Sequence, residues 1–409
     1  MIKYLRLEYL FVFMALIWIP LQRYILKFDG AGNTVALLAI FVLITLSVQK
    51  TFYKTAFKKP LIIWFIWVVY AFFNTLLHGY KSELPTHSFL LNISVPFILM
   101  LIIALMYKVN PRKIINVILS GLYFGLILVF IFEQNTDQGR IGSEINSNTI
   151  GTMGTITCML LYINYFKKYM NIKMLAVLAV IPVYAIISTG SRTAFGGLAF
   201  LIALHFFINR SKYLVVTLFK MLIAVIIMLL PFNYILDNTS LGERILSTTE
   251  QSQGMKFETG NAVLDMFGDR GFFYYQGWEV FKDQPLTGVG LEQFKYYNQL
   301  ELDQHSEYMI QLTELGLIGF VLFFAFYYLL FKHLKFLNKI RYFKREPELF
   351  MGLIIIILLM ITATRMYRIW YYFTIVGLAI GYINQNIFIL ERQKKEILSS
   401  KKRLTNKFW

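Results

Sequence analysis

Long apolar runs recur along most of the chain and are separated by polar connections that are mostly short. A run of about 20 apolar residues is long enough to cross a bilayer as an α-helix. The pattern therefore predicts an all-α polytopic membrane protein with about twelve transmembrane helices. We expect the spans at about 9–26, 33–49, 61–78, 88–107, 114–132, 147–166, 174–190, 193–209, 213–231, 309–331, 349–364 and 369–389.

One connection, residues 232–308 between the ninth and tenth spans, is far longer than the others. Helix connections usually have about 2–8 residues, and long loops are often functional. We therefore expect four parts: helices one to nine (1–231), an extracytoplasmic loop with short interfacial helices (232–308), helices ten to twelve (309–389) and a basic cytoplasmic tail (390–409).

The composition agrees with a membrane protein. Hydrophobic residues make up 57% of the chain and charged residues 15%, whereas soluble domains carry about 25% charged residues. The net charge of +17 could suggest a nucleic-acid partner, but Lys and Arg gather in alternate connections and in the tail. By the positive-inside rule these connections and both termini are cytoplasmic, so the charge requires no nucleic acid.

A histidine stands at the start of the tenth predicted span. Ser306 is a candidate N-cap and Glu307 falls in the first turn, which would place His305 just outside the positive end of the helix. Helix N-termini attract anions. A lone histidine at this position is usually only a polar residue at the water interface. A functional role for His305 therefore requires support from the residues around it.

Arginines on the predicted outer side supply such neighbours. A desolvated guanidinium costs free energy unless it is paired or binds an anion. Each arginine alone would be an interfacial anchor, but together with His305 they predict a rim that binds a diphosphate. The arginines are Arg140, Arg192, Arg244, Arg270, Arg365 and Arg368.

The large loop also contains a predicted helix and a predicted turn. Phe272–Asp283 places Tyr274, Trp278 and Phe281 on one face, which suits the membrane interface. Residues 285–290 (Pro-Leu-Thr-Gly-Val-Gly) then break the chain. Gly288 and Gly290 lack the third glycine of a dinucleotide motif, so we expect a tight turn that approaches a neighbouring backbone.

These motifs resemble the O-antigen ligase superfamily. His305-Ser306, then nine residues, then Gly316-Leu317-Ile318-Gly319 is similar to the signature of that family. The segment 285–290 with Phe294 looks like the segment that precedes this signature. Residues 191–194 (Ser-Arg-Thr-Ala) look like the short arginine turn of the family, and Arg270 falls where its large loop carries an arginine.

The resemblance implies a bacterial enzyme at the outer face of the cytoplasmic membrane. The donor would be an undecaprenyl diphosphate-linked saccharide and the acceptor a glycan or glycolipid, with no nucleotide sugar, cofactor or metal. As a hypothesis, Arg192 and Arg270 grip the diphosphate and His305 takes the acceptor proton in one inverting displacement. The expected substrate-binding residues are Arg140, Arg244, Arg365, Arg368, Ser306, Gly288 and Gly290.

The sequence leaves the acceptor open. Ser306 stands where the family most often has Asn, and Phe320-Val321 follow Gly319 where some ligases have threonines. Repeat-unit polymerase is therefore slightly favoured over ligase. One rival is a peptidoglycan polymerase of the shape, elongation and division class. Another is a lipid-linked oligosaccharide flippase or other transporter, but no acidic residue lies near the middle of any predicted span, as ion-coupled transport usually requires.

Overall fold

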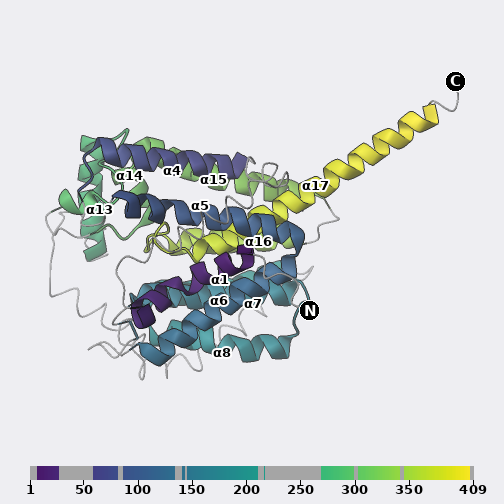
Figure 1. The fold of residues 1–409 in the computed structure, drawn as a ribbon, viewed down its shortest axis with the longest axis horizontal. Helices are drawn as coiled ribbons and strands as arrows, with labels where there is room; N and C mark the ends of the chain where they lie inside the picture. The colour runs from purple at the N-terminus through teal and green to yellow at the C-terminus, as the bar shows by residue number, and fades with distance from the viewer. Residues whose placement is uncertain are drawn as a thin grey trace.

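A computed structural model describes residues 7–26, 59–81, 86–133, 141–142, 145–210, 216, 269–298, 303–340 and 345–405. All regular elements among them are helices, and most lie side by side in one bundle (Figure 1). The helices before the large loop are α1 (Leu7–Pro20, continued by a π-helical turn at Leu21–Leu26), α4 (Lys59–Leu77), α5 (Thr86–Val109), α6 (Pro111–Phe132), α7 (Ser147–Phe166), α8 (Ile172–Ser188) and α9 (Arg192–Ile208).

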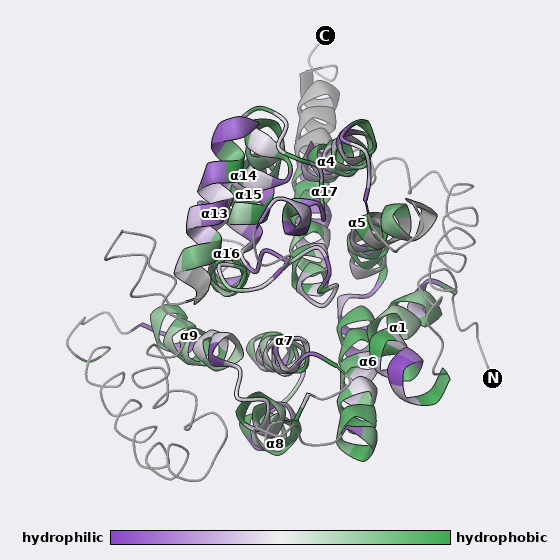
Figure 2. Ribbon diagram, turned by 90° about the vertical axis from the view of Figure 1, so that its left-hand side faces the viewer, coloured by the Kyte–Doolittle hydropathy of each residue, from purple (hydrophilic) through white to green (hydrophobic). Residues whose placement is uncertain are grey.

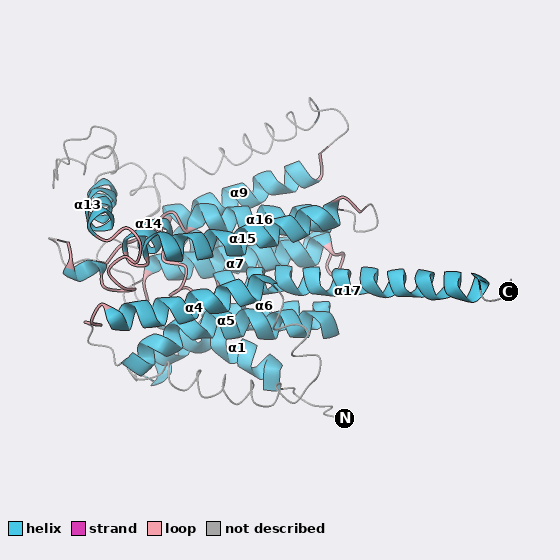
Figure 3. Cartoon of the chain, turned by 90° about the horizontal axis from the view of Figure 1, so that it is seen from above, coloured by secondary structure: helices cyan, strands magenta, loops and turns pink. Residues whose placement is uncertain are grey.

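The remaining helices belong to the second half of the chain. They are α13 (Asp269–Asp283), a 3₁₀ turn at Phe294–Tyr296, α14 (Glu307–Thr313), α15 (Gly316–Asn338), α16 (Glu346–Met360) and α17 (Tyr372–Thr405). Helix α13 runs across one end of the bundle, whereas α17 continues beyond the opposite end (Figures 1 and 3).

Among the described residues, five helices are long and apolar enough to span a membrane: Leu7–Leu26, Lys59–Leu77, Pro111–Phe132, Gly316–Asn338 and Tyr372–Gln393. Shorter apolar helices cover Ile93–Val109, Ile172–Ser188 and Arg192–Ile208. The structure thus supports an all-helical protein with several membrane helices. The predicted spans at 33–49 and 213–231, and most of the large loop before residue 269, lie outside the described residues.

Small residues allow the helices of the bundle to approach closely. In α17, a Cβ added at Gly377 would lie 3.0 Å from Cβ of Ile103, and one at Gly381 would lie 2.5 Å from Cβ of Tyr107 in α5. In α9, a Cβ at Gly197 would lie 2.6 Å from Sδ of Met360 in α16. Glycine at such contacts is typical of helices that pack within a bilayer.

Hydrophobic residues dominate most of the bundle, whereas hydrophilic residues are prominent on α13 and around α14 (Figure 2). Apolar side chains from α1, α4 and α15 form part of the core, among them Trp64, Trp67 and Phe323, all nearly inaccessible to solvent. The polar end of the bundle is therefore where α13 and α14 meet the connection between α16 and α17.

One predicted span requires a correction. The sequence predicted a single tenth helix over 309–331, but the structure divides this stretch into α14, which ends at Thr313, and α15, which runs from Gly316 to Asn338. Gly316 has a φ of +63°, which lies outside the right-handed helical region and is readily adopted by glycine. Gly316 therefore marks the break: α14 ends shortly before it, at Thr313, and α15 begins with it.

Candidate active site at the α13–α14 end

His305 precedes Ser306, the N-cap residue of α14, and is exposed. Its ring meets the ring of Phe273 in α13 edge to face, with the ring centroids 5.9 Å apart. Its backbone N–H donates to Oε1 of Gln304 at 3.0 Å, while Nε2 of Gln304 donates to the carbonyl of Phe273 at 3.1 Å. The buried Gln304 amide thus ties the histidine segment to α13 and leaves the imidazole at the surface.

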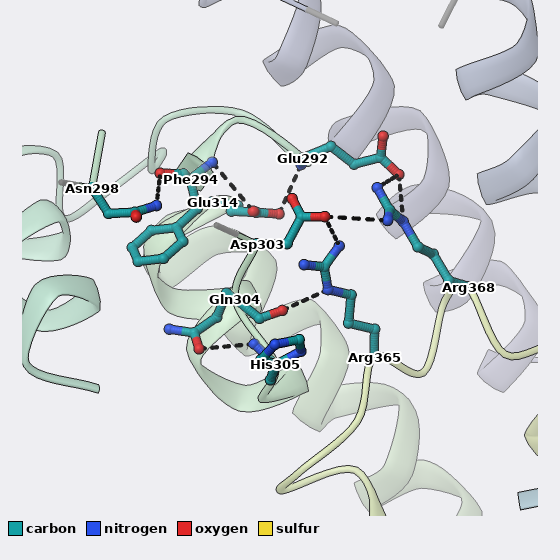
Figure 4. A network of polar contacts seen from close by, with 9 residues as sticks. All are labelled: Glu292, Phe294, Asn298, Asp303, Gln304, His305, Glu314, Arg365 and Arg368. Carbon is teal, nitrogen blue, oxygen red and sulfur yellow. Dashed lines mark hydrogen bonds and ion pairs between the residues drawn. The ribbon is translucent and has the colours of Figure 1, made fainter. Parts of the chain in front are cut away.

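A second clamp on this segment comes from the connection between α16 and α17. Nε of Arg365 donates to the carbonyl of Gln304 at 2.5 Å, and its Nη1 lies 2.9 Å from Oδ2 of Asp303 (Figure 4). The Arg365 side chain is only 11% exposed. Burial lowers the pKa of Arg365 to about 10, so the guanidinium is still charged near neutral pH. Arg365 therefore holds the two residues before His305.

Arg368 makes the neighbouring ion pair. Its Nη2 and Nε lie 2.9 and 3.0 Å from Oε1 of Glu292, and its Nη1 lies 3.5 Å from Asp303 (Figure 4). Glu292 is buried and has a φ of +66°, a left-handed conformation that is uncommon outside glycine. Its backbone N–H donates to Glu314 at 2.8 Å. Bonds at both ends of Glu292 thus hold a strained residue in place.

The segment 285–290 joins both ends of the break between α14 and α15. The N–H groups of Val289 and Gly290 donate to the carbonyls of Thr313 and Glu314 at 3.1 and 2.8 Å. In return, Leu317 and Ile318 donate to the carbonyls of Pro285 and Leu286 at 2.9 and 3.3 Å. Helix ends leave such groups without intrahelical partners, so the segment satisfies both ends at once.

Gly288 and Gly290 are required by this close approach. Both have positive φ, +68° and +95°. A Cβ at Gly288 would lie 2.5 Å from the carbonyl carbon of Glu314, and one at Gly290 would lie 3.1 Å from Cα of Thr75 in α4. The prediction of a tight turn against a neighbouring backbone is confirmed.

Helix α4 supports the same junction with polar side chains. Nδ2 of Asn74 donates to the carbonyl of Thr287 at 2.9 Å, and the hydroxyl of Tyr70 donates to the carbonyl of Leu315 at 2.8 Å. Nε1 of Trp67 donates to Oε1 of Gln311 in α14 at 2.8 Å. These bonds explain why a largely apolar helix carries polar residues along one part of its length.

Two carboxyl groups are buried beside the break, outside the candidate spans. Burial raises the pKa of Glu307 to about 7 and that of Glu314 to about 8. Glu307 accepts from the N–H of Met366 at 2.7 Å and from Nε2 of Gln311 at 2.8 Å, and Glu314 accepts from two N–H groups of the loop. Both acids therefore connect chain segments, although desolvation opposes their charged forms.

The arginine turn between α8 and α9 is built differently. Gly190 has a φ of +61°, and Ser191 caps α9 by accepting from the N–H of Ala194 at 3.4 Å. The Ser191 hydroxyl also donates to Oδ1 of Asn148 in α7 at 2.9 Å. Arg192 follows as the first residue of α9 and is exposed. Serine, rather than arginine, fixes this turn.

Polar contacts connect this turn to the His305 end. The hydroxyl of Tyr372 lies 3.3 Å from Oγ1 of Thr152 in α7 and 2.9 Å from Oγ1 of Thr364. The N–H of Glu307 donates to the carbonyl of Ile361 at 3.0 Å. The first turn of α9, the 361–371 connection and α14 therefore lie at the same end of the bundle.

The other predicted site residues have different outcomes. Ser306 occupies the N-cap position, but it makes no side-chain capping bond, and its buried Oγ has no hydrogen-bond partner among the described residues. Arg270 is the second residue of α13, and only its backbone position is described. Arg140 and Arg244 lie outside the described residues.

The predicted aromatic stripe of α13 is divided between two environments. Trp278 is 50% exposed and its ring lies 5.3 Å from that of Phe281. Tyr274 instead donates to the carbonyl of Thr362 at 3.0 Å. Part of the face expected at the membrane interface therefore holds the 361–371 connection.

Sequence reasoning missed the residues that hold these pieces together: Asp303, Gln304, Glu292, Glu307 and Glu314. The available signal was the surplus of acids in the loop, twelve acidic against five basic residues over 232–308. The nearby arginines offered partners for some of these acids. Matching Asp303 and Glu292 to Arg365 and Arg368 would have required the fold.

The sequence that forms much of this site also matches a known protein family. Residues 175–324 match the family model described as O-antigen ligase. This stretch is therefore similar to an O-antigen ligase domain. The match includes α8, α9, α13, α14 and the His305 signature, and it supports the O-antigen ligase and polymerase superfamily. A search of curated proteins finds no match. An enzyme of the glycosyltransferase type in a membrane follows from the family.

Proposed function

We propose that this O-antigen ligase-family protein transfers a saccharide from an undecaprenyl diphosphate carrier to an acceptor hydroxyl at the outer face of the bacterial cytoplasmic membrane. The observation that carries the proposal is an exposed imidazole whose backbone is fixed from two sides. Gln304 ties His305 to α13, and Arg365 ties the preceding carbonyl to the α16–α17 connection. A general base needs such a defined position to reach an acceptor hydroxyl.

In this mechanism His305 accepts the proton of the acceptor hydroxyl as the oxygen attacks the anomeric carbon. The bond between that carbon and the diphosphate oxygen breaks, and the electron pair leaves with the diphosphate. One displacement inverts the anomeric configuration and requires no metal. Arg192 and Arg270 stabilise the charge that grows on the diphosphate. Ser306, Arg140 and Arg244 remain candidates for saccharide or diphosphate contacts.

The two arginines of the 361–371 connection receive distinct roles. The Arg365 side chain is 11% exposed and bound to Asp303 and Gln304, which supports a positioning role. The Arg368 side chain is 39% exposed, so it can contact the donor while remaining paired with Glu292. Gly288 and Gly290 act by shaping the backbone at the α14–α15 break.

A reconstituted reaction tests the proposal. Purified protein in lipid vesicles receives an undecaprenyl diphosphate-linked repeat unit, with or without lipid A core, and the products are separated by size. We expect a ladder without core, because the chain lacks the threonines that follow the signature in some ligases. A product that requires core would make it a ligase. Absence of any new glycosidic bond with a cognate donor would favour the transporter alternative.

His305→Ala provides the matched variant for this assay. Loss of a general base typically lowers the rate by about 10²–10⁴-fold. His78→Ala is the control, because His78 lies in the same part of the molecule yet faces Asn74 and Thr287. Near-normal turnover of His305→Ala would contradict the mechanism.

A further inference from the structure

A cavity of about 270 Å³ lies among α4, α15 and α17, away from the His305 site. It is lined by Lys59 and Pro60 from α4, His333 from α15, and residues 380–387 of α17. His333 is seventeen residues beyond Gly316 in α15, which corresponds to about 26 Å at 1.5 Å per residue. The positive-inside pattern assigns this end of the bundle to the cytoplasmic leaflet.

Asn384 places an amide in the wall of this cavity without a protein partner. The residue is 7% exposed, and its Nδ2 makes no hydrogen bond among the described residues. A buried donor without an acceptor destabilises the folded protein. A ligand oxygen that accepts from Nδ2 would satisfy this donor.

The groups around the amide favour an anion. Lys59 brings a positive charge at the described start of α4. His333 adds a second nitrogen-bearing side chain. Ile380, Ile383 and Ile387, on the same helix as Asn384, form an apolar wall. Cationic and amide donors beside an apolar wall suit a phosphate that carries hydrocarbon.

The larger cavity, about 610 Å³ between α1 and α6, is a weaker candidate. Its cations are already engaged: Nζ of Lys113 lies 4.5 Å from the ring centroid of Tyr9, and the guanidinium of Arg112 lies 5.6 Å from that of Tyr169. Asn116, which also lines it, accepts from Asn164 at 3.3 Å. Both of its cations and Asn116 therefore have partners within the protein.

We propose that the α4–α15–α17 cavity binds the phosphate of an anionic phospholipid of the cytoplasmic leaflet. A phosphate oxygen accepts from Nδ2 of Asn384, Lys59 supplies the opposite charge, and the acyl chains follow the isoleucine wall into the bilayer. The site is separate from the glycosyl-transfer site, so it stands whether or not the proposed reaction is correct.

Lipid retention and thermal stability test this site in the full-length protein. The protein is placed in nanodiscs of phosphatidylcholine with or without phosphatidylglycerol, and retained lipid is counted by native mass spectrometry. We expect phosphatidylglycerol to be retained and to raise the melting temperature. Lys59→Gln should weaken this retention about tenfold, because a charge-assisted contact is lost. Lys335→Gln, an exposed lysine on α15 outside the cavity lining, should leave it unchanged.

Asn384→Leu gives a result that a purely structural role would not produce. It should raise the melting temperature in phosphatidylcholine alone, because the unpaired amide is gone, and abolish the gain from phosphatidylglycerol. If Asn384→Leu shifted the melting temperature equally in bilayers with and without phosphatidylglycerol, the proposal would be overturned. Equal effects of Lys59→Gln and Lys335→Gln would also overturn it. Stabilisation by inorganic phosphate in detergent equal to that by lipid would overturn the assignment to a phospholipid.

Discussion

The turn at 189–192 and the connection at 361–371 both bring arginine to the same end of the bundle, but they use it differently. In the first, Ser191 caps α9 and binds Asn148, while Arg192 stays exposed. In the second, Arg365 and Arg368 are bound by Asp303 and Glu292. Arg365 and Arg368 thus hold chain segments together through buried or partly buried ion pairs, whereas Arg192 is exposed at the start of α9.

The difference suggests that the two regions have different roles: one arginine binds the donor and the other positions His305. In the proposed mechanism the exposed Arg192 contacts the diphosphate, whereas Arg365 fixes the residues that precede His305. Removing the first should affect the reaction more than the fold, and removing the second should affect both. The predictions below separate these two cases, beginning with the largest effect.

Arg192→Ala should lower the rate of glycosyl transfer about 10²–10³-fold, because transition-state charge on the diphosphate loses a donor. The free energy of unfolding should change by no more than about 0.5 kcal/mol, as for other exposed residues. Turnover in vesicles and thermal unfolding measure the two effects. Arg192→Lys keeps the charge without the planar guanidinium, so its rate of glycosyl transfer should fall between the rates of the unmodified protein and of Arg192→Ala. A stability loss as large as that of Arg365→Ala would remove the contrast between the two regions.

Glycine substitutions compare how tightly each region is packed. Gly288→Ala should cost about 2–5 kcal/mol, because a Cβ would meet the Glu314 backbone at a positive φ. Gly151→Ala should cost about 1–3 kcal/mol, since its Cβ would lie 2.9 Å from the Cβ atoms of Ser191 and Ala194.

Gly196→Ala is the control for both substitutions, measured by thermal unfolding in the same detergent. It lies inside α9 with nothing within 4 Å of an added Cβ, so it should be neutral or stabilising by up to about 1 kcal/mol. If Gly288→Ala were equally harmless, the tight approach of 285–290 to the α14–α15 break would be wrong.

The sequence predicted much of this arrangement because its signals are local. Apolar periodicity gave α7 at 147–166 with the same bounds, and Ser191 and the glycines marked turns that the structure contains. It missed the break within 309–331, because that break depends on hydrogen bonds to Pro285 and Leu286. It also missed the ion pairs of Arg365 and Arg368, whose partners lie 60 to 80 residues earlier in the chain.

Arg365→Ala should destabilise the protein by about 1–3 kcal/mol, because Asp303 and the Gln304 carbonyl lose a charged donor. It should also lower turnover through misplacement of His305. A double-mutant cycle with Asp303→Asn measures the coupling, which we expect to be about 0.5–2 kcal/mol. Arg368 and Glu292 give the parallel cycle. Additive effects of Arg365 and Asp303 would show that the ion pair does not hold the histidine segment.

The buried carboxyls add a pH dependence that the 189–192 turn should lack. Burial raises the folded pKa of Glu314 to about 8 from 4.5, so the folded state binds a proton more tightly than the unfolded state. The contribution of Glu314 to stability is then fully present below about pH 4.5 and is lost as pH rises towards 8, by at most about 1.4 kcal/mol per pH unit. Glu314→Gln should flatten this decline in a pH series of thermal unfolding. Glu279→Gln, at an exposed carboxylate of α13 paired with Lys282, should leave the slope intact.

An unchanged slope in Glu314→Gln would mean that Glu314 is already ionised in the folded protein. Its bonds to the N–H groups of Glu292 and Phe294 would then outweigh desolvation, and the remaining decline would come from other groups, among them Glu307.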